Sequence, residues 1–224
     1  MHERRWATMD APLIDAVLSL PRLRALSCCP FEGDPAPWVA LSSIPGLSWL
    51  HLADTGRKSH LSRLPSIALC PSLTHLSLIC PAIYGPAFLA FFTGANIRRL
   101  WSLDLDSLDL TPTTKLGTRT AVIPRHDIVE AFSGLKALRR LRLRWITNLV
   151  EMIPCLAELP ALQLAILEPL TAEVIPVREA IVVLLRNTAK KDPAFVVSLR
   201  YPGSRDQARA WMVHELQTPR FRFE

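Results

Sequence analysis

The sequence predicts an α/β fold, a leucine-rich-repeat solenoid of about six to seven irregular repeats. Two observations predict it. A Leu-x-x-Leu-x-Leu frame recurs along the chain, and prolines recur between the apolar stretches, with 19 prolines against only 8 glycines. In such a fold each repeat supplies one short strand. We therefore expect a parallel sheet on the concave side, short helices and loops on the convex side, and a helical cap at the C-terminal end.

The frame is clearest in two segments. Residues 45–52 read Pro-Gly-Leu-Ser-Trp-Leu-His-Leu, and residues 71–78 read Pro-Ser-Leu-Thr-His-Leu-Ser-Leu. The first leucine of each copy falls at position 23, 47, 73, 100, 138 or 162, in steps of 24, 26, 27, 38 and 24 residues. The last two leucines of a frame alternate along a strand and turn inward, while the residues between them turn to the concave face. The copies are expected to stack in parallel around one core.

The segments between the frames predict short helices. We expect helices over residues 11–20, 87–92, 128–132, 148–158 and 177–189, and single turns over 38–42 and 61–68. Asp10 and Asp127 are expected to cap the first and third helices, because their side-chain oxygens can accept hydrogen bonds from free N–H groups of the first turn. A final strand is expected over 194–201.

The whole chain, 1–224, is predicted to form a single leucine-rich-repeat domain. The long step of 38 residues contains a polar, threonine-rich segment, and residues 111–127 are expected to be a loop inserted in the solenoid. Residues 203–224 are expected to form the C-terminal cap. Ser204 followed by Gln207 is a capping-box pattern, which predicts a helix to about residue 217.

Composition restricts the class of protein. Half of the residues are apolar and 21% are charged, which argues against disorder. No uninterrupted apolar stretch of ~18 residues occurs, so no membrane span is expected, and the N-terminus lacks the apolar stretch of a signal peptide. The cysteines are odd in number and show no Cys-x-x-Cys spacing, which indicates reduced thiols in a cytoplasmic or nuclear protein; they are Cys28, Cys29, Cys70, Cys80 and Cys155.

Two rows of side chains are expected to cross the concave face. The third repeat position gives Ala25, Trp49, His75, Ser102, Arg140 and Leu164, and the fifth gives Ser27, His51, Ser77, Asp104, Arg142 and Ile166. Tryptophan and arginine are enriched in binding hot spots, and Asp104 opposite Arg142 predicts an exposed ion pair. The alternative is a solvated face without a partner. The predicted partner-binding residues are Trp49, His51, His75, Ser77, Ser102, Asp104, Arg140, Arg142 and Arg144.

Catalysis and metal binding are not expected. The residue types of a hydrolase triad are present as His51, Ser77 and Asp104, but a triad needs histidine between the other two, and here serine lies in the middle. There is also no Gly-x-Ser-x-Gly turn to present a nucleophile. A metal site from His51, His75 and Cys80 is not favoured either. We expect no enzyme, no cofactor and no metal.

Residues 71–78 and 159–167 resemble the repeats of fungal F-box-like leucine-rich-repeat proteins. The tail from Lys191 to Val197, followed by a polar segment with Trp211, is similar to the end of such chains. In that family an N-terminal F-box docks on the adaptor of a cullin–RING ubiquitin ligase, and the repeats recruit substrates. Only about 20 residues precede the first repeat here, too few for the F-box. The resemblance therefore implies the repeat architecture and an interaction role.

The predicted function is a non-enzymatic protein-interaction module that binds an unknown protein through its concave face. The alternative is a nucleic-acid-binding protein, because the net charge is +6 and cations gather in the middle of the chain. A diverged chain without a retained function is a third interpretation, since the repeats are irregular and lack the usual asparagine after the strand. The central basic patch comprises Arg98, Arg99, Lys136, Arg139, Arg140, Arg142 and Arg144.

Overall fold

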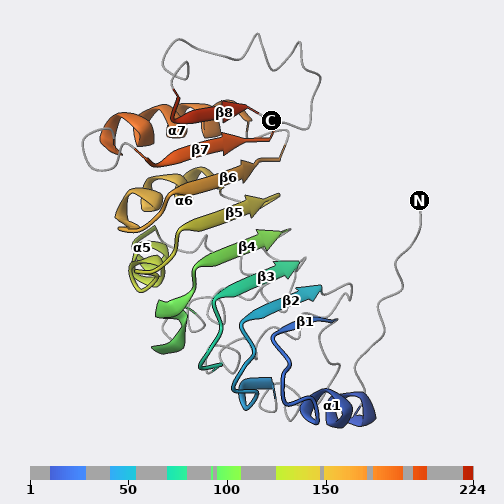
Figure 1. The fold of residues 1–224 in the computed structure, drawn as a ribbon. Helices are drawn as coiled ribbons and strands as arrows, with labels where there is room; N and C mark the ends of the chain where they lie inside the picture. The colour runs from blue at the N-terminus through green and yellow to red at the C-terminus, as the bar shows by residue number, and fades with distance from the viewer. Residues whose placement is uncertain are drawn as a thin grey trace, which may run out of the picture.

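A computed structural model gives the structure of the chain. It describes residues 11–28, 41–53, 70–79, 92, 95–106, 125–146, 149–170, 174–188, 194–200 and 219–223. These residues contain one sheet of eight strands, all parallel, in the order in which they occur along the chain (Figure 1). The predicted α/β class and parallel sheet are confirmed. The strands are β1 (Ala25–Cys28), β2 (Trp49–Ala53), β3 (His75–Ile79), β4 (Ser102–Asp106), β5 (Arg140–Arg144), β6 (Leu164–Glu168), β7 (Val196–Leu199) and β8 (Phe221–Phe223).

The leucines of the repeat frame form the core, as predicted. Leu50, Leu76, Leu103 and Leu141 occupy one register line across β2–β5, and each is at most 2% exposed. A second line follows two positions later, with Leu52, Leu78, Leu105 and Leu143. Burying a leucine side chain stabilises a fold by about 1.5–3 kcal/mol. The two lines therefore hold the strands in this register, because a slip by one residue would turn all of them to solvent.

A tight turn precedes each of the first six strands and explains the recurring prolines. In each turn the N–H of the first frame leucine donates to a carbonyl three residues earlier, as from Leu47 to Ile44 and from Leu73 to Cys70. Proline fixes the φ angle that the second position of such a turn requires. It stands at that position in four of the six turns, as Pro21, Pro45, Pro71 and Pro160.

The turns are also joined from one repeat to the next. The carbonyl of Ser48 accepts the N–H groups of Thr74 and His75, each at 2.9 Å, and the carbonyl of Thr74 accepts those of Trp101 and Ser102. The same double acceptance recurs at Arg24, Trp101 and Arg139. The ladder of backbone bonds therefore begins before the strands and fixes the spacing of the side chains at their N-terminal ends.

Helices α5 (Arg125–Ser133), α6 (Leu149–Met152) and α7 (Val174–Thr188) lie along one side of the sheet, and α1 (Ala11–Leu18) lies beyond β1 at the end of the sheet (Figure 1). Most lie where the sequence predicts them, although half of the predicted 148–158 helix has 3-10 geometry. The helix predicted over 177–189 begins three residues earlier, because Pro176 fits the first helical turn, where its missing N–H costs nothing. The 3-10 helix at 95–99 was not predicted. The 3-10 elements are η2 (Ala95–Arg99) and η3 (Ile153–Glu158).

Three local predictions are wrong. Helix α5 begins at Arg125, so 125–127 is helical rather than the end of the 111–127 loop, and Asp127 lies within the first turn instead of capping it. At the C-terminal end, Phe221–Phe223 forms a strand beside β7 within the predicted 203–224 helical cap. The predicted 204–217 helix, the 61–68 turn, most of 87–92 and 38–42, and Asp10 lie outside the described residues.

Candidate functional site

The sheet has one face on the leucine core and an opposite face, which we call the open face. The two predicted rows lie on the open face in the predicted register. Trp49, His75, Ser102 and Arg140 form one line, and the next line runs through His51, Ser77, Asp104 and Arg142. A third line, two positions further on, contains Asp106, Arg144 and Glu168. The structure thus brings all nine predicted site residues onto one surface.

Aromatic side chains cover the β2–β4 end of this surface. Trp49 stacks on His51, two residues later on the same strand, with ring centroids 6.0 Å apart and planes within 16°. His75 on the next strand lies 5.3 Å from the ring of Trp101 in a tilted arrangement. Trp49 is 38% exposed and Trp101 is 43% exposed. Trp101 was missed by the sequence analysis, because it lies just before β4 and outside the alternation that assigns residues to faces.

The two histidines are held by neighbouring hydroxyl groups. His51 Nδ1 lies 2.9 Å from Ser77 Oγ, and His75 Nδ1 lies 2.9 Å from Thr74 Oγ1. Burial lowers the pKa of His51, and the negative charges of Asp104 and Asp106 oppose this effect only partly. His51 is therefore neutral at physiological pH. Ser77 stands between His51 and Asp104 in the register, as the sequence predicts.

Metal ligands do not gather on this surface. No group of three histidine, cysteine, aspartate or glutamate side chains within the described ranges is placed to hold a metal ion. Cys80, which the sequence analysis weighed as a ligand, lies outside these ranges. The cysteines that are described, Cys28, Cys70 and Cys155, are buried and not in disulfides, and burial raises the pKa of Cys70 to about 11.

A network of charges covers the β4–β6 end. Arg142 donates from Nε and Nη2 to Glu168 Oε1, at 3.0 and 2.6 Å. Arg200 Nη1 lies 3.3 Å from the same oxygen, and Arg144 Nε lies 3.2 Å from Glu168 Oε2. The contact between Arg144 Nε and Glu168 Oε2 is an ion pair that lacks hydrogen-bond geometry. Three arginines therefore share the single negative charge of Glu168.

Aspartates complete the network. Arg144 Nη1 lies 3.0 Å from Asp106 Oδ2, and Arg142 Nη1 lies 3.8 Å from Asp104 Oδ2. The predicted pair of Asp104 and Arg142 is thus present, but the closer partner of Arg142 is Glu168. Burial raises the pKa of Asp104, and the positive charges of Arg142 and Arg144 act against this rise. Glu168 and Asp106 were not among the predicted site residues, although both occupy the seventh repeat position, like Arg144.

The open face is closed beyond β5. Ile166, which was expected to be exposed in the second row, is only 4% exposed, and Ser198 beside it is fully buried. Leu164 is half-buried. The accessible part of the surface therefore ends at β5.

A hollow of about 330 Å³ occupies that accessible part. Its position between the aromatic end and the charge network makes it the candidate binding site. Arg140, which lines the hollow, is exposed, and its side chain makes no hydrogen bond or ion pair within the described part of the chain. The hollow is lined by Trp49, His51, His75, Leu76, Ser77, Ser102, Leu103, Asp104, Arg140 and Arg142.

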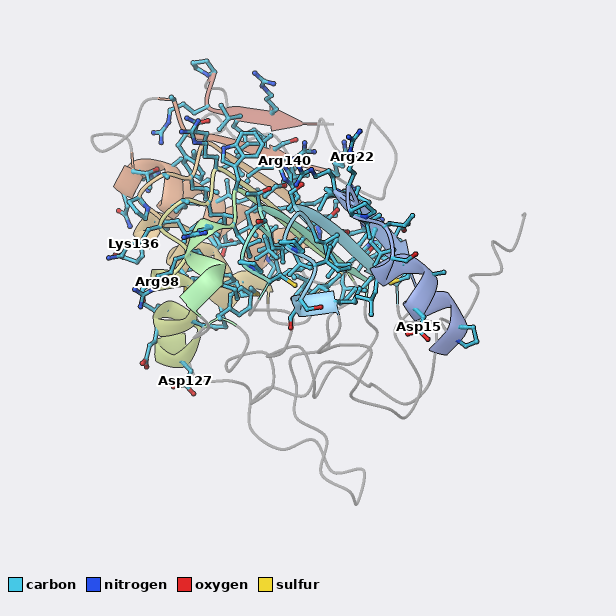
Figure 2. The ribbon with its side chains drawn as sticks, turned by 60° about the horizontal axis from the view of Figure 1, so that its bottom comes forward. Asp15, Arg22, Arg98, Asp127, Lys136 and Arg140 are labelled. Atoms are coloured by element: carbon cyan, nitrogen blue, oxygen red, sulfur yellow. The ribbon has the colours of Figure 1, made fainter. Side chains whose placement is uncertain are left out.

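The predicted basic patch is divided in the structure. Arg142 and Arg144 are paired with carboxylates, and Arg99 Nη1 donates to the carbonyl of Pro71 at 3.0 Å. Figure 2 shows Arg98 and Lys136 together on one side of the molecule and Arg140 apart from them. The seven cations therefore do not form one continuous surface.

Comparison with known proteins gives no family for this chain. No protein-family model matches it, and no curated protein sequence matches it significantly. Among the helices of the described ranges, none has the length and apolar character needed to cross a bilayer. The function is therefore inferred from the fold and the candidate site.

Proposed function

We propose that the chain is a leucine-rich-repeat solenoid that acts as a non-enzymatic protein-interaction module and binds its partner at the hollow of the open face. The solenoid assignment is supported by the six turn–strand units that follow one another in register. Each unit buries its leucines only against its neighbours, as repeat architectures require.

The observation that carries the binding proposal is the exposure of Trp49 and Trp101 on the same surface as the unpaired Arg140. A tryptophan side chain presents roughly 150–250 Å² of surface, so the exposed part of each ring represents on the order of 2 kcal/mol of unrealised burial. A partner that covers both rings gains this energy, and Arg140 supplies a directional contact. Tryptophan and arginine are the residue types that dominate binding energy at protein interfaces.

The resemblance of residues 71–78 to F-box-like repeats suggests the role of this module. We also propose that the partner is recruited as a substrate of a ubiquitin ligase. Recruiting a substrate is the role of the repeats in such proteins and does not involve the F-box. The nucleic-acid alternative has less support, because carboxylates neutralise Arg142 and Arg144, and binding to a phosphate backbone depends on clustered unpaired cations.

A photocrosslinking experiment tests the proposed face. A photoreactive phenylalanine analogue replaces Trp101 in one version of the full chain and Arg98, an exposed residue of η2, in another. We expect a protein adduct from cell extract at position 101 and not at position 98, and its loss when Trp49 and Arg140 are both changed to alanine. Equal adducts at both positions, or an adduct that survives the double change, would contradict the proposal.

A salt series separates the two classes of partner. A nucleic-acid partner would dissociate steeply between low and physiological salt, and nuclease treatment would remove it. We expect the adduct at position 101 to survive nuclease treatment.

A further inference from the structure

The charges left over on the open face indicate the chemistry of the partner. The carboxylates of Asp104, Asp106 and Glu168 each lie within ion-pair distance of an arginine of the same surface. Arg140 has no such partner in the described part of the chain. A partner that docks here must bring an acceptor for Arg140, because an arginine buried without one loses its hydration uncompensated. Charge complementarity therefore calls for an anionic group.

The surroundings of Arg140 favour a single carboxylate over a polyanion. Asp104 lines the same hollow from the neighbouring strand. Its carboxylate would repel the additional negative charges that a polyanion brings beyond the one paired with Arg140. A carboxylate can accept two parallel hydrogen bonds from one guanidinium group. One acidic side chain fits this arrangement, whereas a run of phosphates does not.

The aromatic end of the hollow defines a second contact at a fixed distance. Trp49 and Arg140 lie in one register line, separated by His75 and Ser102. Adjacent strands are about 4.8 Å apart, so three steps span about 14 Å. An extended peptide advances about 3.3 Å per residue. A chain that crosses the strands would therefore place an apolar side chain at Trp49 about four residues from a carboxylate at Arg140, and this even separation turns both side chains to the same face of the extended peptide.

We propose that the hollow binds an extended segment of a partner protein in which one acidic residue stands four positions from an apolar residue. The carboxylate pairs with Arg140, and the apolar side chain packs between the rings of Trp49, His75 and Trp101. This inference rests on the proposed function, and names the chemistry that the partner must carry.

Selection from a library of random short peptides tests the inference. The full chain and its Arg140→Glu and Arg98→Glu variants are immobilised, and bound peptides are sequenced. We expect the full chain and Arg98→Glu to enrich peptides with aspartate or glutamate at the stated spacing from an apolar residue, and Arg140→Glu to lose this preference. A fluorescein-labelled synthetic peptide of the enriched sequence should bind Arg140→Glu about 10- to 100-fold more weakly than Arg98→Glu.

The variants are matched, since both place glutamate at an exposed arginine, and circular dichroism with urea unfolding establishes that each is folded. Arg140→Gln, which removes the charge without reversing it, should show an intermediate loss. The inference is overturned if no peptides are enriched, if acidic residues are not enriched at a fixed spacing, or if Arg140→Glu keeps the acidic preference. Any of these results together with a protein adduct at position 101 would leave the proposed function in place. If neither the adduct nor enriched peptides are found, the proposed function and this inference are both overturned.

Discussion

Arg142 donates two hydrogen bonds to a single oxygen of Glu168, at 3.0 and 2.6 Å, across the β5–β6 pair. The glutamate side chain is 13% exposed and the arginine side chain 19%, so this pair lies between a surface ion pair and a buried one. Surface pairs contribute about 0–1 kcal/mol, and removing one partner of a buried pair costs about 3–5 kcal/mol. Glu168 also faces Arg144 and Arg200, so its loss affects three cations.

Glu168→Gln should lower the free energy of unfolding by about 2 kcal/mol, because three partly buried arginines lose their shared anion. Urea unfolding followed by circular dichroism measures the change. The control is Glu158→Gln at an exposed position of η3, which should change stability by less than about 0.5 kcal/mol. If the two variants are equally stable, the network contributes no more than exposed charges do.

Leu103→Ala should destabilise the fold by about 3 kcal/mol, since it leaves a cavity in the middle of the leucine core. Leu103 in β4 is fully buried, whereas Leu20, the first residue of the turn before β1, is 50% exposed. Leu20→Ala is therefore the matched control and should cost less than about 0.5 kcal/mol. Comparable losses in the two variants would argue against the inward direction of the frame leucines.

That inward direction could be predicted from the sequence because it depends on a local pattern. Leucines two residues apart can share a face only in an extended strand, and matching the frames position by position aligned the strands in their observed register. The same alignment placed Trp49, His75 and Arg140 in one line. Most of the fold and all nine proposed site residues followed from this one periodicity.

The missed features depend on contacts that the repeat frame does not contain. Glu168 pairs with Arg142 from the next strand, two positions beyond the residue directly opposite Arg142. How many arginines it contacts depends on the packing of neighbouring strands, which the repeat frame does not give. The exposure of Trp101 follows from the turn before β4, where alternation does not apply. Strand β8 has only three residues, too few to show a period, and Ile166 is covered although its position in the frame predicts exposure.

The free energy of unfolding should decrease as the pH falls below about 6.5. Burial lowers the pKa of His51 in the folded chain below its ordinary value of 6.5. As the pH falls, the unfolded state binds the proton first, so the folded state loses stability until the pH drops below the lower, folded pKa. His51→Gln keeps a polar side chain at this position and should lack this component in urea unfolding between about pH 8 and about pH 5.

Asp104 acts in the opposite sense and at more acidic pH. Its pKa is raised in the folded state from 3.8, so the folded carboxyl group binds a proton before the unfolded one does and stability is gained as the pH falls through the raised pKa. The difference between the wild-type and His51→Gln curves isolates the histidine, because both retain Asp104. Parallel curves for the two proteins would show that His51 titrates alike in the folded and unfolded states.

Trp145 should be replaced more readily by asparagine than by valine. It adopts a φ of 50° at the end of β5, where its N–H donates to the carbonyl of Glu168 at 2.8 Å. This left-handed conformation costs roughly 1–2 kcal/mol for most residues and is tolerated best by glycine and asparagine. The ring is 48% exposed and lies 5.7 Å from the Arg144 guanidinium group, a contact that both variants lose. Trp145→Asn should therefore be about 1 kcal/mol more stable than Trp145→Val in urea unfolding. The same pair of substitutions at Ser27, an exposed residue of β1, should give the reverse order, because valine is favoured over asparagine in a strand. A valine variant at 145 that equals the asparagine variant would mean that the backbone there relaxes out of the left-handed region.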